Sequence, residues 1–350
     1  MNKVRRIVVN SIDDIHIEHV PAPRPAPGEV LVNSTVVGIC GSDMHAAHGR
    51  HPFMSLPFWP GHEVVGVVAD VGEGADPSLV SRRVVVEPNL ACGHCDQCLA
   101  GRYNICATLD VFGCQTPGGM TDLFTIAEDR VIPLPDGMDD TWAALIEPLS
   151  TPAHAVRRAG DLRGRRIVVI GAGPIGLFAA IAALDAGAER VVVADVLASK
   201  RARAERLGAH GSFDSTSADA VDRAIELLGG KAHVVFDCVS IAATVDLAIS
   251  VLDKGATLMT VGVAAGATPI RLDLVQDREL TIIGNLMYVR EDVLHAIDIL
   301  SRKTFPIEEL VTSTFDIEDA AGAFAASDDP EQVKVLITVA ASERGDNMTE

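Results

Sequence analysis

The stretch RRIVVIGAGPIG, residues 165–176, decides how this chain must fold. Its apolar half is typical of a short strand. Gly171, Gly173 and Gly176 then follow in the order G-x-G-x-x-G, before the alanine-rich segment LFAAIAALDAG. A strand, a glycine turn and a helix in this order form a dinucleotide-binding turn. The first glycine permits the tight turn, the second lets the backbone approach a pyrophosphate, and the third lets helix and strand pack closely.

The residues around this turn predict the cofactor. Pro174 and Ile175 complete the loop at the helix N-terminus, whose free N–H groups would face the pyrophosphate. Asp195 ends the next apolar run, VVVAD, 19 residues after Gly176. A carboxylate at this position accepts hydrogen bonds from the ribose hydroxyls and repels a 2′-phosphate, which favours NAD over NADP. Lys200, in the basic run that follows, moderates this preference because a basic cluster can hold a phosphate.

Strand-like and helix-like segments alternate from residue 152 to residue 289. This alternation is typical of βαβ units and predicts a doubly wound parallel sheet of the α/β class. Residues 1–151 differ, because short β-like runs such as EVLVNSTVVG and EVVGVVADVG recur there with few helical patterns, which favours a barrel or a sandwich. A helix and a last strand-like run, VKVLITV, come after residue 290, and we expect the tail at 343–350 to be flexible.

Length and charge limit the class of protein. The chain has 350 residues, which favours two domains, and its formal net charge of −19 argues against nucleic-acid binding. Its apolar runs are shorter than a membrane span, and its first residues lack the apolar core of a secretion signal. We therefore expect a cytoplasmic protein that binds neither nucleic acid nor membranes.

Four cysteines stand in one short segment, CGHCDQCLAGRYNIC. Their spacing, C-x2-C-x2-C-x7-C, fits a closed tetrahedral zinc site, which stabilises a loop and performs no chemistry. A redox-active C-x-x-C pair and an iron–sulfur cluster are the alternatives. An odd total of seven cysteines without an export signal argues against disulfides. We predict a structural zinc held by Cys92, Cys95, Cys98 and Cys106.

A second set of metal-binding residue types is spread over three segments. Cys40 stands in GICGSDMHAAHG, His62 and Glu63 stand in PGHEVVG, and Glu147 follows the apolar run TWAALI. A catalytic zinc takes three protein ligands and keeps a fourth position open, so Cys40, His62 and one glutamate would complete a site. Spacing does not decide between the two glutamates, and a glutamate such as Glu147, taken alone, more often caps a helix than binds a metal.

The motifs GICGSDMH, GHEVVG, the four-cysteine loop, EPLS and GAGPIG stand in this order along the chain. Together they resemble the zinc-dependent medium-chain dehydrogenases, and most closely the polyol branch with sorbitol, butanediol and threonine dehydrogenases. The resemblance covers the chain apart from its tail. It implies a GroES-like catalytic domain at 1–151, completed by 290–342, and a Rossmann NAD-binding domain at 152–289. It also implies two zinc ions per chain and a homo-oligomer, either a dimer or a tetramer.

The resemblance assigns the catalytic zinc ligands. In the polyol branch a glutamate followed by proline takes the place of a cysteine ligand, and in this chain that glutamate is Glu147. The implied ligands are therefore Cys40, His62 and Glu147. In some members Glu63 would coordinate instead, so we expect it to exchange with Glu147 or to lie beside the ligands.

The implied reaction is the transfer of a hydride between a secondary alcohol and NAD. Ser42 and His45 match the family's relay positions, which carry the substrate proton to the surface. The segment AAHGRHPFMSLPFW, residues 46–59, matches no substrate signature. A polyol, sugar, cyclitol or diol is therefore expected, and a threonine-like β-hydroxy amino acid is the alternative. A zinc-free double-bond reductase or a non-catalytic nucleotide-binding relative is disfavoured, because such proteins lack ligands that this chain has.

Overall fold

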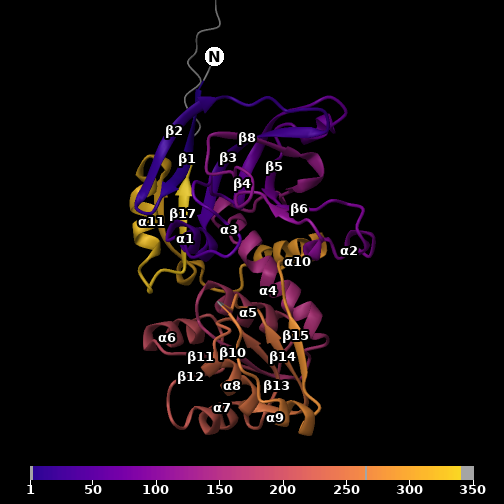
Figure 1. Ribbon diagram of the computed structural model, residues 1–350, viewed down its shortest axis with the longest axis vertical. Coiled ribbons are helices and arrows are strands. Elements are labelled where there is room, and N and C mark those ends of the chain that lie inside the picture. Colours follow the sequence, from indigo (N-terminus) through magenta and orange to yellow (C-terminus); the bar gives the residue numbers. More distant parts are fainter. Residues whose placement is uncertain (1–2, 265, 340–350) are drawn as a thin grey trace, which may run out of the picture. The chain divides into compact units, whose positions relative to one another are not determined.

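The computed structural model describes residues 3–264 and 266–339. The chain divides into two compact units (Figure 1). Unit 1 comprises Met1–Glu147 and Val311–Glu350, and unit 2 comprises Pro148–Leu310. The tail at 343–350, which we expected to be flexible, lies outside the described residues.

A seven-stranded sheet forms the centre of unit 1, in the order β16-β17-β3-β4-β5-β9, with β8 also paired to β3. The strand β16 is parallel to β17, and the other pairs are antiparallel. Its strands are β3 (Glu29–Ile39), β4 (Glu63–Val71), β5 (Arg83–Val86), β8 (Leu123–Ala127), β9 (Val131–Pro133), β16 (Val311–Asp316) and β17 (Lys334–Thr338). Because β17 pairs with β3, a segment near the end of the chain completes a sheet that begins near its start.

Smaller elements surround this sheet in unit 1. Two further strand pairs are β1 (Lys3–Ser11) with β2 (Asp14–Pro21) and β6 (Asn89–Leu90) with β7 (Asp110–Val111). The α-helices are α1 (Gly41–Ala47), α2 (Asp96–Leu99), α3 (Asp140–Ala143) and α11 (Ala320–Ser327). The 3₁₀ helices are η1 (Pro77–Leu79), η2 (Tyr103–Ile105), η3 (Glu128–Arg130) and η5 (Ile317–Asp319).

The burial pattern of β3 explains where the first site forms. Buried residues alternate with partly exposed ones from Val30 to Val36, and then Val36, Val37, Gly38 and Ile39 are buried in succession. A strand with one covered face alternates in burial, whereas successive burial means that both faces are covered. The end of β3 that leads to Cys40 therefore lies in the interior of unit 1.

A six-stranded sheet forms the centre of unit 2, in the order β12-β11-β10-β13-β14-β15. Every pairing in it is parallel, which confirms the doubly wound parallel sheet predicted from the sequence. The strand order changes direction at β10, and the crevice at such a switch point is where these sheets bind ligands. The strands are β10 (Arg166–Ile170), β11 (Arg190–Asp195), β12 (Ser212–Asp214), β13 (Ala232–Asp237), β14 (Leu252–Thr260) and β15 (Thr281–Gly284).

The helices of unit 2 alternate with its strands along the chain, and the first of them, α4, begins two residues before the unit does. They are α4 (Ile146–Ala159), α5 (Pro174–Asp185), α6 (Ala198–Arg206), α7 (Ala220–Leu228), α8 (Ala242–Val251), α9 (Leu272–Asp277), α10 (Arg290–Ser301) and the 3₁₀ helix η4 (Ile307–Glu309). Within residues 3–264 and 266–339, no helix is long and apolar enough to cross a bilayer.

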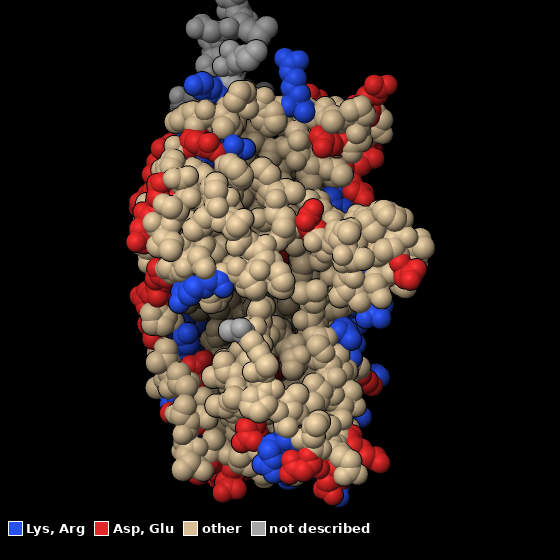
Figure 2. All heavy atoms as spheres, viewed as in Figure 1, with Lys and Arg blue, Asp and Glu red and all other residues tan. Residues whose placement is uncertain are grey.

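Charged side chains are distributed unevenly over the visible surface. Figure 2 shows Asp and Glu gathered along one margin of unit 1, while Lys and Arg stand in small separate groups. A nucleic-acid interface would instead gather basic side chains into a continuous patch or stripe. The visible basic side chains are thus dispersed, in a chain whose formal net charge is −19.

Helix α10 belongs to unit 2, although the sequence assigned the chain from residue 290 onward to the first domain. Its Asp292 is 1% exposed, and the Oδ2 atom of Asp292 lies 2.8 Å from Nδ1 of His154 on α4. Arg157 Nε, also on α4, donates to Asp292 Oδ1 at 2.6 Å. Burial raises the pKa of Asp292, but the hydrogen bonds from His154 and Arg157 outweigh burial and lower it to about 2. These contacts attach α10 to α4.

Replacing this carboxylate should weaken unit 2. We expect Asp292→Asn to lower the free energy of unfolding by roughly 2–4 kcal/mol, because it removes the buried carboxylate charge that His154 and the more exposed Arg157 contact. Asp292 stabilises the fold fully above its unfolded pKa of 3.8, and this contribution is lost only as pH falls towards 2. The difference in unfolding free energy between wild type and Asp292→Asn, measured by urea denaturation, should therefore be the same from about pH 5 to about pH 8. The matched control Glu291→Gln, at an exposed partner of Arg157, should cost less than about 1 kcal/mol. Equal losses from both variants would contradict this account.

Candidate functional site

The four predicted cysteines come together in the loop between β6 and β7. Their ligand atoms lie within 4.8 Å of one another, and none of the four is in a disulfide. The Sγ of Cys95 lies 3.5 Å from that of Cys98 and 4.0 Å from that of Cys106, and the Sγ atoms of Cys92 and Cys98 lie 3.9 Å apart. A tetrahedron with zinc–sulfur distances of about 2.3 Å has edges of about 3.8 Å. The sulfur positions therefore fit a closed zinc site.

Backbone N–H groups of the same loop favour the thiolate forms. Cys92 N donates to Cys106 Sγ at 3.3 Å, and Thr108 N donates to the same sulfur at 3.4 Å. These two donors lower the pKa of Cys106, and backbone donors at Ala107 and Cys98 lower the pKa of Cys95. Because zinc binds the thiolate, the loop is prepared for a metal by its own backbone.

A second group of potential ligands forms where β3 ends and β4 begins. The ligand atoms of Cys40, His62 and Glu63 lie within 4.8 Å of one another. Cys40 directly follows β3, and Glu63 is the first residue of β4 and pairs with Gly38 across the antiparallel ladder. His62 and Glu63 are buried. The tertiary structure therefore brings together three of the residues that the sequence proposed for a metal.

The helix α1 begins immediately after Cys40 and carries the residues that contact His62. Asp43 is fully buried, and its Oδ2 accepts a hydrogen bond from Cys40 N at 2.9 Å. Its Oδ1 lies 3.6 Å from His62 Nδ1, while Ser42 Oγ lies 3.5 Å from His62 Nε2. Burial raises the pKa of Asp43, although the charge of His62 opposes this shift. His45 is exposed in the last turn of the same helix.

Glu147 lies in the first turn of α4 and is 8% exposed. Among the described residues, the group that could hold a metal beside Cys40 includes Glu63, and Glu147 is outside it. The carboxylate of Glu147 acts at longer range on Lys334, where its charge helps to raise the pKa of the ammonium group. The assignment of Glu147 as a ligand stays a prediction.

Sequence reasoning missed Lys334, the first residue of β17. This lysine is 2% exposed, and its Nζ donates to Glu63 Oε1 at 2.5 Å and to the carbonyl oxygen of Ile39 at 3.1 Å. Burial lowers the pKa of Lys334, but the charges of Glu63 and Cys40 outweigh burial, and the net shift is upward. A signal was present in the sequence, since VKVLITV places one cation inside an apolar strand.

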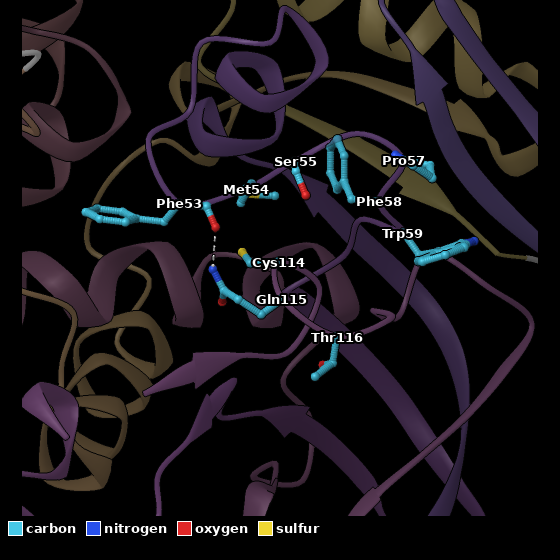
Figure 3. A pocket seen from close by; sticks show the side chains of 9 residues that line it. All are labelled: Phe53, Met54, Ser55, Pro57, Phe58, Trp59, Cys114, Gln115 and Thr116. Atoms are coloured by element: carbon cyan, nitrogen blue, oxygen red, sulfur yellow. Dashed lines mark hydrogen bonds between the residues drawn. The ribbon is translucent and has the colours of Figure 1, made fainter. Parts of the chain in front are cut away.

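A cavity of about 190 Å³ lies within unit 1 next to His62. Cys114, which the sequence left unassigned, lines this cavity, and its Sγ lies 3.9 Å from His62 Nδ1. Gln115 Nε2 donates to the carbonyl oxygen of Phe53 at 3.0 Å and joins the two segments that form the walls (Figure 3). The lining residues are Phe53, Met54, Ser55, Pro57, Phe58, Trp59, Cys114, Gln115 and Thr116.

The glycine turn of unit 2 has the geometry that its sequence predicted. Gly171 has φ +95° and Gly173 is the N-cap of α5, while Pro174 and Ile175 begin that helix. A Cβ on Gly176 would lie 1.7 Å from the carbonyl oxygen of Gly171, so the close approach of helix and turn requires glycine there. The turn leaves the carboxyl end of β10, where the sheet order changes direction.

Asp195 reaches this turn from the end of β11. Its Oδ2 accepts a hydrogen bond from Ala172 N at 2.7 Å, and its Oδ1 accepts one from Leu197 N at 2.9 Å. The nearest cation held beside it is Arg201, whose Nη1 donates to the carbonyl oxygen of Asp195 at 2.9 Å. Lys200 precedes it on α6 and is partly exposed. The acid predicted to contact a ribose is therefore beside the glycine turn.

Comparison with known proteins gives matches along most of the chain. Residues 26–136 match the alcohol dehydrogenase GroES-like domain, which confirms the expected fold of unit 1, and residues 174–302 match a family described as zinc-binding dehydrogenase. Sorbitol dehydrogenase from Bos taurus is 35% identical over 340 residues, which cover 95% of this chain and 95% of that protein.

Two solved structures have the same fold with a cofactor bound. A zinc-binding dehydrogenase from Sinorhizobium meliloti 1021, bound to NADP, has a TM-score of 0.90 at 28% identity, covering 97% of this chain and 100% of that one. A protein described as a short chain alcohol dehydrogenase, from Escherichia coli CFT073 and complexed with NADH, has a TM-score of 0.89 at 27% identity, covering 97% and 100%.

The four-cysteine loop can be tested by removing one thiolate. We expect Cys98→Ser to lose about one zinc per chain and to unfold at a lower temperature, because a structural zinc contributes its binding energy to folding. Metal analysis by mass spectrometry and thermal unfolding measure the two effects. The matched control is Leu99→Ala, at a 74% exposed neighbour on the same helix, which should keep its zinc. Unchanged zinc content in folded Cys98→Ser protein would refute the assignment.

Proposed function

This chain belongs to the zinc-containing medium-chain dehydrogenase family and is a zinc-containing, NAD(P)-linked alcohol or polyol dehydrogenase, and from this we propose that it oxidises a secondary hydroxyl of a neutral polyol with NAD. The observation that carries the proposal is the position of the half-buried Cys40 and the buried His62 and Glu63 beside an uncharged cavity. The bovine relative is a sorbitol dehydrogenase, which supports the polyol class.

The residues present fit a catalytic zinc. Cys40 and His62 offer a thiolate and an imidazole, and Glu63 or Glu147 offers the carboxylate of the third ligand. Glu63 Oε2 is buried without a hydrogen-bond partner among the described residues, and such an atom is costly unless a cation or a donor compensates it. When bound, zinc supplies a Lewis acid for the substrate hydroxyl, and NAD supplies the acceptor of the hydride.

The residues of α1 orient the ligand and carry the proton in this proposal. Asp43 faces His62 Nδ1 and fixes the ring, as acids commonly do for metal-binding histidines. Ser42 Oγ lies at the other ring nitrogen, where it takes the proton of the substrate hydroxyl. His45, exposed one turn further along the helix, passes the proton to water.

The cavity favours a neutral substrate over an amino acid. Among its nine lining residues, the side chain that can ionise is the thiol of Cys114, and burial raises the pKa of that thiol. A carboxylate or ammonium group on the substrate would therefore meet no opposite charge there, whereas buried charges need such partners. Thr116 also lines the cavity and is likewise uncharged. Phe53, Phe58 and Trp59 are the aromatic residues of the lining.

A substrate panel tests this proposal. We expect NADH formation, measured by absorbance, with neutral polyols and vicinal diols, and a kcat/KM at least about tenfold lower with threonine and with sugar acids, because one unpaired charge costs upwards of about 1.4 kcal/mol. The same preparation should hold about two zinc ions per chain. The neutral substrate class would be wrong if threonine or a sugar acid were preferred. A count of one zinc per chain would contradict the proposed catalytic zinc.

The choice of NAD over NADP rests on Asp195. Its carboxylate lies at the glycine turn, and a 2′-phosphate beside it would be repelled. We expect Asp195→Asn, which keeps an oxygen for Leu197 N, to raise the ratio of kcat/KM for NADP to that for NAD by about tenfold. The control is Asp214→Asn on the neighbouring strand, whose carboxylate pairs with Arg201 at 3.6 Å. An unchanged ratio in Asp195→Asn would show that another residue selects the cofactor.

A further inference from the structure

Lys334, which forms a buried ion pair with the candidate ligand Glu63, has no part in the reaction described so far. The Nζ atom of Lys334 and the Oε1 atom of Glu63 are 2.5 Å apart, and the two side chains are 2% and 0% exposed. Removing two charges from water is expensive, and an apolar pair of similar volume is often as stable. A pair of this kind beside a metal-binding group therefore calls for a functional account in addition to a structural one.

Three adjacent strands of unit 1 build the pair. Val335 of β17 pairs with Ile39 of β3, and Gly38 of β3 pairs with Glu63 of β4. Lys334, one residue before Val335, thus reaches across β3 to the carboxylate on β4. A Cβ on Gly38 would lie 2.0 Å from Glu63 Oε2, so the glycine leaves the space in which this carboxylate lies.

The two oxygens of Glu63 have different surroundings. Oε1 accepts the hydrogen bond of Lys334, while Oε2 is buried and has no hydrogen-bond partner among the described residues. The same carboxylate belongs to the group of ligand atoms with Cys40 and His62. One oxygen of Glu63 is therefore held by a cation, and the other has no hydrogen-bond partner in the described part of the chain that would compete with a metal.

We propose that Lys334 is a positioning residue that keeps Glu63 a weak and exchangeable ligand, because its ammonium, held between Glu63 Oε1 and the Ile39 carbonyl oxygen, competes with the metal for the carboxylate. This inference rests on the proposed metal centre at Cys40 and His62. Loss of the Lys334 charge would leave Glu63 as an uncompensated anion beside the metal. Glu63 would then bind the metal firmly and occupy the position that the substrate hydroxyl needs.

The test compares Lys334→Met with the double variant Lys334→Met/Glu63→Gln. Each purified protein is stripped of metal, given Co²⁺ as the probe, and followed by its visible absorption and by the Kd of Co²⁺. We expect Lys334→Met to bind Co²⁺ at the Cys40 centre about tenfold more tightly, to change the visible spectrum, and to lose about tenfold or more in kcat.

The double variant separates positioning from folding. It replaces the ion pair by two neutral side chains of similar size, so it should fold even if the single variant is unstable. Its Kd and spectrum should match those of Glu63→Gln alone, because Lys334 acts through the Glu63 carboxylate. A merely structural lysine would shift the melting temperature without this dependence on Glu63.

Results that contradict the catalytic centre differ from results that contradict only the role of Lys334. If wild-type protein binds Co²⁺ at the four cysteines alone, the proposed catalytic centre is wrong, and the role of Lys334 falls with it. If wild-type protein binds a second Co²⁺ but Lys334→Met leaves its Kd and spectrum unchanged, the role of Lys334 alone is overturned. The same conclusion follows if Lys334→Met changes the Kd of Co²⁺ by the same factor in protein that has Glu63 and in protein that carries Glu63→Gln.

Discussion

The antiparallel pairing of β3 with β4 is the constraint on which the first site depends. Gly38 stands opposite Glu63, so Cys40, just beyond the end of β3, and His62, just before β4, come to the same end of the ladder. Both strands are buried at this end, so His62 and Glu63 lie in the interior, with the half-buried Cys40 beside them. A slip of one residue in this register would turn Glu63 to the opposite face and separate the group.

The C-terminal strand completes this arrangement by adding a charge. Strand β17 joins the sheet at β3 and brings Lys334 to a carboxylate that the first part of the chain leaves buried. Thiol, imidazole and carboxylate groups gathered in one interior place need cations, which a bound metal and Lys334 would provide together. The first unit therefore needs both ends of the described chain, because the sheet and its charge balance are shared between them.

The two units differ in how much of each site lies in a continuous stretch. In unit 2 the strand, the glycine turn and the helix follow one another directly, and Asp195 comes from the adjacent parallel strand. In unit 1 the residues around His62 come from separate segments, and Gln115 links two segments of the cavity wall by its hydrogen bond to Phe53. A continuous motif specifies its own geometry, whereas separated segments meet only through the sheet that holds them.

The sequence by itself determined the parallel sheet, the glycine turn and the four-cysteine loop, because each depends on local spacing: strand and helix periods, the positions that require glycine, and sulfurs held in one short loop. It also named Cys40, His62 and both glutamates as metal-binding candidates. The tertiary structure alone decided that Glu63 groups with Cys40 and His62, that Lys334 neutralises it, and that Cys114 lines the cavity beside His62. These contacts join residues far apart in the chain, and the register of β17, β3 and β4, which no local pattern encodes, sets their distances.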